Sequence, residues 1–147
     1  MQLIGSRNYR QSNYTVMTHL LPAQYNTLFK ISFLSFGTSI YAIYHKHYKL
    51  SLCPGGVFLT SIHYWRKPEP WRRKIDMTYV FFALLYQLYQ AYRSTYRIQY
   101  YTLTLIAGSM YPLAIYYSRQ EQYWRSTYAH CALHVLANMA NIFLYSG

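Results

Sequence analysis

Five apolar segments, separated by short basic ones, are the feature that most constrains how this chain can fold. Lysine and arginine lie almost entirely in the gaps between these segments, and only Lys30 interrupts one of them near its start. A helix that crosses a membrane needs about 17 to 25 mostly apolar residues, which the segments reach or approach. We therefore expect five helices joined by short loops, at residues 27–44, 50–65, 75–92, 98–117 and 128–145.

The amino-acid composition supports a membrane fold rather than a soluble one. Mean hydropathy is close to zero, but 20 tyrosines lower it although each carries an apolar ring that suits the membrane boundary. Three carboxylates in 147 residues cannot cover a soluble domain, in which about a quarter of the residues are charged. We predict an all-α fold, a polytopic transmembrane bundle at residues 27–147 that follows a polar N-terminal segment at residues 1–26.

The net charge of +11 is typical of chains that bind nucleic acid or anionic lipid, or that keep positive loops on one side of a bilayer. The basic residues lie between apolar segments and not on a soluble core, so we expect membrane lipids and no nucleic acid as partners. With five crossings, only Lys46, Lys49, Arg93 and Arg97 of the 14 lysines and arginines lie on the side away from the N-terminus. The positive-inside rule then places the N-terminus in the cytoplasm of an integral membrane protein.

The segment at residues 60–76 joins the second apolar segment to the third and carries most of the candidate site. It is rich in lysine and arginine and contains two prolines, so we interpret it as a cytoplasmic loop that can bind anionic lipid headgroups. The polar residues Ser61 and His63 end the apolar segment before it, and Asp76 opens the next. His130 and His134 begin the fifth helix on the same side of the membrane, so we expect these five side chains to lie at one depth.

The histidines and the acid each allow more than one interpretation. His130 and His134 are four residues apart, so they share one helix face and can ligate one metal ion, with Asn138 and Asn141 continuing the stripe. The same stripe can instead form hydrogen bonds to neighbouring helices. Asp76 can act in catalysis, cap a helix N-terminus or pair with a neighbouring arginine.

These residues resemble the membrane hydrolase superfamily that includes alkaline ceramidases and the progestin and adipoQ receptors. That pattern has a Ser, a His four residues later, an Asp across a helix–loop–helix, and His-x-x-x-His on the last helix. Ser61, Asp76, His130 and His134 match the pattern in order and spacing. Trp65 stands at the position of its first metal-binding histidine.

The resemblance implies a zinc-dependent hydrolase that acts on a lipid amide. In that case His130, His134 and His63, which lies two residues before Trp65, would bind the zinc. Asp76 would handle the proton, and Ser61 would stabilise the oxyanion. Residues 64–66 and 71–76 also look like parts of small membrane proteins from algae and large DNA viruses.

A non-catalytic function is the alternative that the sequence leaves open. Aromatic-rich helices with few hydrolytic residues suit a membrane scaffold or a small accessory subunit of a membrane complex, which includes a homo-oligomer. A relative of the hydrolases that keeps their fold and has lost the metal lies between the two hypotheses. Cys53 and Cys131 fall inside apolar segments, so we expect both to be free and buried.

Overall fold

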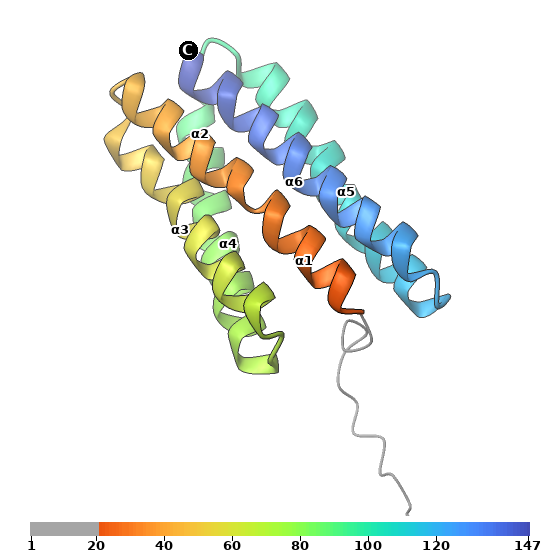
Figure 1. Ribbon diagram of the computed structural model, residues 1–147. Coiled ribbons are helices and arrows are strands. Elements are labelled where there is room, and N and C mark those ends of the chain that lie inside the picture. Colours follow the sequence, from red (N-terminus) through yellow and green to blue (C-terminus); the bar gives the residue numbers. More distant parts are fainter. Residues whose placement is uncertain (1–20) are drawn as a thin grey trace, which may run out of the picture.

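The computed structural model describes residues 21–147 as a bundle of helices (Figure 1). Over these residues no strand occurs, and the all-α prediction is confirmed for them. Residues 1–20 of the predicted polar segment, which include Arg7 and Arg10, lie outside the described residues. The helices are α1 (Pro22–Ile31), α2 (Phe33–Tyr44), α3 (Tyr48–Arg66), α4 (Pro70–Ala91), α5 (Arg97–Arg119) and α6 (Tyr123–Ser146).

The helices α1 and α2 lie end to end and form one bent rod, so the chain runs up and down through five rods (Figure 1). At their junction Ser32 is fully buried, and its hydroxyl donates a hydrogen bond to the Leu28 carbonyl at 2.8 Å. A serine that bonds the carbonyl four residues earlier often bends a helix. The five rods correspond to the five apolar segments of the sequence.

The first rod begins at Pro22, earlier than the expected start at residue 27. Proline suits the first position of a helix because it lacks an N–H that would find no partner there. The Gln24 side chain accepts a hydrogen bond from the backbone N–H of Leu21 at 2.6 Å, which satisfies a further free group at this helix end.

The segment at residues 60–76 is mostly helical, so the interpretation of the whole segment as a loop was wrong. Helix α3 continues to Arg66 and α4 begins at Pro70, which leaves only residues 67–69 as a connection. Glu69 stabilises this turn, because it lies 2.8 Å from the Lys67 ammonium and 3.0 Å from Nε of Arg72. The hydrogen bond from Lys67, supported by Arg72, lowers the pKa of the Glu69 carboxyl.

Helix α3 continues through Pro54, Gly55 and Gly56, although a proline and two glycines weaken a helix. Tyr79 of α4 braces this part of α3, since its hydroxyl donates to the Leu52 carbonyl at 2.7 Å. The Tyr79 ring lies against Gly56, where a Cβ would be 2.0 Å from the ring. The glycine therefore allows a close approach of α4 that holds the weakened helix in place.

Two packed clusters lie at opposite ends of the bundle. One combines residues from the ends of all five rods, namely Ala42, Leu50, Ala91, Tyr100, Ala140, Leu144 and Tyr145. The other, at the end with the α3–α4 turn, consists of Leu28, Tyr64 and Trp65 with partly buried aromatic neighbours. Helix α4 packs on α3 and meets α5 at only a few points, so the middle of the bundle is less tightly filled.

No helix in residues 21–147 combines the length and the mean hydropathy that a membrane crossing requires. Both cysteines are free, as the sequence predicts. Cys53 is buried as expected, whereas Cys131 is only half-buried.

The close approach at Gly56 predicts a contrast between two glycines. Gly56→Ala should lower the free energy of unfolding by about 1–2 kcal/mol, since the new methyl group displaces Tyr79 and breaks its hydrogen bond to Leu52. Gly37→Ala should be neutral or stabilise by up to about 1 kcal/mol, because alanine favours a helix and nothing lies near Gly37. Thermal unfolding of the purified variants measures both effects, and equal midpoints would contradict the prediction.

Candidate functional site

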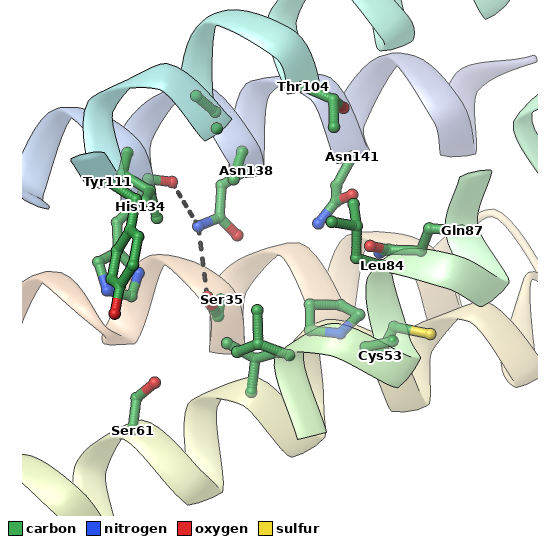
Figure 2. Close-up of a pocket in the computed structure, with 18 of the residues that line it drawn as sticks. Ser35, Cys53, Ser61, Leu84, Gln87, Thr104, Tyr111, His134, Asn138 and Asn141 are labelled. Atoms are coloured by element: carbon green, nitrogen blue, oxygen red, sulfur yellow. Dashed lines mark hydrogen bonds between the residues drawn. The ribbon is translucent and has the colours of Figure 1, made fainter. Parts of the chain in front are cut away.

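A cavity of about 270 Å³ lies between the rods and is the candidate site. All five rods contribute to its wall, and most of the lining side chains are apolar. Polar side chains line it along its length, from Ser61 near one end to Gln87 near the other (Figure 2). An apolar cavity with a few converging polar groups is the usual form of a small-molecule site.

Four of the five residues predicted for the site line this cavity, namely Ser61, Asp76, His130 and His134. They come from α3, α4 and α6, so residues far apart in the sequence meet there. His63, the fifth, does not line the cavity. The expectation that all five lie together is therefore met by four.

Asp76 is held by two hydroxyl groups of α3. Its Oδ1 accepts a hydrogen bond from Thr60 at 2.6 Å and from Ser61 at 2.9 Å. Asp76 lies well inside α4, which Glu69 caps, so it is not a helix cap. Among residues 21–147 the only ion pairs join Glu69 to Lys67 and to Arg72, so no cation pairs with Asp76.

The neighbouring arginine, Arg73, donates instead to the Tyr111 hydroxyl at 2.9 Å. Tyr111 belongs to α5 and lines the cavity, so this bond connects α4 to α5 near the Asp76 end. The cavity therefore contains a carboxylate whose hydrogen bonds come from two hydroxyl groups of α3.

The two histidines of α6 face one another beside Trp65. The ring centres of His130 and His134 are 5.2 Å apart, and the Trp65 ring stands almost perpendicular to that of His130 at 5.4 Å. Trp65 is only 3% exposed and belongs to the packed cluster at this end. Nδ1 of His130 is buried without a hydrogen-bond partner among the described residues.

His63 lies on the outside of the bundle, which removes it from the predicted ligand set. Its side chain is exposed, and its ring packs edge-on against Trp71 at 5.4 Å. The Arg72 guanidinium donates to the His63 carbonyl at 3.0 Å, which holds this turn of α3 against the start of α4. Two residues along a helix turn a side chain to nearly the opposite face, which explains its position.

The residues present do not fit the zinc centre that the family resemblance implies. A catalytic zinc takes three protein ligands and a water, and His130 and His134 supply two. The third position holds the indole of Trp65, which carries a hydrogen-bond donor and no nitrogen lone pair for a metal. Within residues 21–147 no three His, Cys, Asp or Glu side chains form a group that could hold a metal ion.

Asn138 behaves as the structural interpretation of the α6 stripe predicts. Its Oδ1 accepts from the Thr38 hydroxyl at 2.6 Å, and its Nδ2 donates to the His134 carbonyl at 2.7 Å and to Ser35 at 3.3 Å (Figure 2). The bonds to Thr38 and Ser35 join α6 to α2. Asn141, one turn further along, lines the cavity without such a bond.

Sequence reasoning missed Thr60, Gln87 and Tyr111 as parts of the site. Thr60 is next to Ser61 and carries the same chemical group, so its position could have been inferred from the helix–loop–helix pattern. Gln87 is three turns after Asp76, and an amide within an apolar helix is a detectable signal. Tyr111 is one of 20 tyrosines, and nothing in the sequence distinguishes it.

Comparison of the chain with protein-family models, with curated proteins and with solved structures finds no match in any of the three. The function must therefore be argued from the cavity itself.

The hydrogen bond to Asp76 predicts a large effect of a small substitution in α3. Thr60→Val keeps the shape of the side chain and removes the donor, so the free energy of unfolding should fall by about 1–2 kcal/mol. Thr78→Val makes the same change at an exposed position of α4 and should have little effect. Denaturant unfolding measures the difference, and equal stability of the two variants would show that Thr60 does not hold Asp76.

Proposed function

We propose that this chain is a membrane-embedded relative of the ceramidase-like hydrolases that binds a lipid-like molecule in its cavity without a catalytic zinc. The observation that carries the proposal is the position of Trp65, whose indole occupies the place of the third ligand beside two histidines. A bundle that keeps Ser61, Asp76 and the histidine pair around one cavity retains the binding site of such a hydrolase. It lacks the ligand set that would activate water.

The distribution of charge over the rods supports the membrane part of the proposal. Between the ends of the rods there is no Asp, Glu, Lys or Arg at residues 31–45, 50–65, 77–92, 98–118 and 126–147. Large apolar side chains cover the outside of these stretches, with Phe82, Leu105 and Ile40 among the most exposed. The outward faces of soluble helices are normally polar, and exposed apolar surface of this extent marks contact with lipid or with another protein.

The lengths of the rods are also suitable for a bilayer. Helices of 19 to 24 residues extend roughly 28–36 Å at 1.5 Å per residue, close to the ~30 Å of a hydrocarbon core. Tyrosine lowers the mean hydropathy of these helices, although its ring is apolar and its hydroxyl favours the interface.

The cavity itself supports a lipid-like ligand. Apolar side chains occur along the wall, among them Val80 and Leu84 of α4 and Leu133 and Ala137 of α6. The polar side chains in the middle, Ser35 and Asn138, are bonded to each other. A molecule with a long apolar body and a polar head matches this distribution, since burial of the body is favourable at about 25 cal/mol per Å². Asp76 accepts hydrogen bonds, so the polar head must offer a donor, as an amide or a hydroxyl does.

The membrane proposal predicts that an arginine reduces membrane insertion at the middle of α4 but not at its end. Phe82 is 63% exposed, and Tyr92, the C-cap residue of α4, is 71% exposed. Phe82→Arg should reduce membrane insertion, because an arginine at the centre of a membrane helix costs about 2.5–3.5 kcal/mol. Tyr92→Arg should be tolerated at the interface.

Carbonate extraction of membranes from cells that express each variant measures this. The unaltered chain and Tyr92→Arg should stay in the pellet, and Phe82→Arg should be depleted from it. If the unaltered chain is released by carbonate, or if both variants behave alike, the helices do not lie in lipid.

The metal-free proposal predicts a gain of zinc from a single substitution. Trp65→His adds an imidazole beside His130 and His134 and should allow the purified protein to bind stoichiometric zinc, because three ligands suffice. Trp124→His, the same change at an exposed position, should not. Elemental analysis of detergent-purified protein measures both, with the unaltered chain expected to contain little zinc.

Two results would overturn this proposal. Stoichiometric zinc in the unaltered chain that is lost in His134→Ala would restore the metal-dependent hydrolase. Absence of zinc from a folded Trp65→His variant would mean that the cavity does not derive from a zinc site.

A further inference from the structure

The end of the cavity away from Asp76 contains a second set of polar groups that the proposed function does not use. Asn141 of α6 and Gln87 of α4 both line this end and lie on facing helices (Figure 2). They are 9% and 7% exposed, respectively, so both amides are almost entirely buried. Buried amides normally have hydrogen-bond partners, because an unpaired one costs about 1–3 kcal/mol.

Asn141 has no such partner among residues 21–147. Asn138, one turn away on the same helix, does have such partners. Asn138 uses both its oxygen and its nitrogen in bonds to Thr38, Ser35 and His134. The Asn141 side chain reaches the cavity and makes no hydrogen bond to the surrounding helices, so its donor and its acceptor both remain free for a ligand.

The Gln87 amide has a hydrogen-bond partner for its nitrogen but none for its oxygen among the described residues. Its Nε2 donates to the Tyr145 hydroxyl at 2.9 Å, and Tyr145 is itself fully buried in the packed cluster at this end. That bond fixes the orientation of the amide and leaves its oxygen without a donor from the described residues. The bond to Tyr145 thus presents a fixed acceptor at the same end of the cavity as the free amide of Asn141.

The middle of the cavity separates these amides from the Asp76 end. Along α4, Asp76 and Gln87 are 11 positions apart in the sequence, which corresponds to roughly 16 Å at 1.5 Å per residue. Val80, Ala83 and Leu84 line the wall between them. The α4 wall between the two ends is therefore apolar, and the polar side chains of Ser35 and Asn138 in the middle of the cavity are already bonded to each other.

We propose that Asn141 and Gln87 form a second polar subsite, which binds a neutral hydrogen-bonding group at the far end of an elongated apolar ligand. This inference rests on the proposed lipid-binding role of the cavity and specifies the ligand class as an amphiphile that is polar at both ends. A hydroxyl group fits best, because it can donate to the Gln87 oxygen and accept from the Asn141 nitrogen. A carboxylate does not fit, since no cation lines this end and a buried charge without a partner is costly.

Binding of three matched probes tests this subsite. They are a medium-chain fatty amide, its ω-hydroxy derivative and its ω-carboxylate, each measured by equilibrium dialysis with the full chain in lipid nanodiscs. The ω-hydroxy amide should bind roughly five- to tenfold more tightly than the plain amide, because it gains hydrogen bonds to amides that otherwise stay unpaired. The ω-carboxylate should bind more weakly than either.

A substitution in α6 assigns the preference to the subsite. Asn141→Leu has a similar size and no polar group, so it should bind the plain and the ω-hydroxy amide equally. Gln99→Leu makes a matched change at an exposed position of α5 and should keep the preference of the unaltered chain. The comparison of probes on the unaltered chain does not depend on the folding of either variant.

The outcomes separate this inference from the proposed function. If the unaltered chain binds the plain and the ω-hydroxy amide equally, the second subsite does not exist and the lipid-binding cavity stands. If the preference persists in Asn141→Leu, the hydroxyl group binds elsewhere and the inference fails. If no probe binds, the lipid-binding function fails, and the subsite fails with it.

Discussion

The hydrogen bonds of Asn138 to the first rod determine how α6 faces the rest of the bundle. Asn138 bonds Thr38 at 2.6 Å and Ser35 at 3.3 Å, and polar contacts of this kind fix the rotation of a helix in an apolar environment. Side chains three and four residues away share the same face. Once Asn138 faces inward, His134 and Asn141 must also face inward, and the polar lining of the cavity follows.

The sequence predicts the rods better than it predicts the turns or the site. Apolar segments between basic gaps locate all five rods, because that pattern depends only on the local sequence. The helical part of the segment at residues 60–76 was not predicted, because its prolines and basic residues are typical of a loop. The turn that Glu69 stabilises with Lys67 and Arg72 spans only residues 67–69. The spacing of Ser61, Asp76, His130 and His134 places four site residues, whereas the unpaired state of Asn141 depends on which neighbours the packing supplies.

A single residue separates the two functions that the sequence leaves open. The third ligand position faces the histidine pair, and helix geometry places Trp65 there and not His63. His63 lies on the outside of the bundle. The indole is large and apolar, and it packs with Leu28 and Tyr64 in the cluster at this end of the bundle. A histidine there would be smaller and would need a partner for each nitrogen. The same position can therefore serve tight packing or metal binding, and in this chain it serves packing.

The two ends of the cavity differ in the hydrogen bonds that they can offer, and this difference determines which groups each end can bind. Asp76 acts as an acceptor and already receives bonds from Thr60 and Ser61, so a further partner at that end must be a donor. Asn141 offers both a donor and an acceptor. A hydroxyl or an amide can therefore bind at either end, because each contains a donor and an acceptor. The distance between the two polar groups of the ligand is then the stricter requirement, because they must span the roughly 16 Å that separates Asp76 from Gln87 along α4.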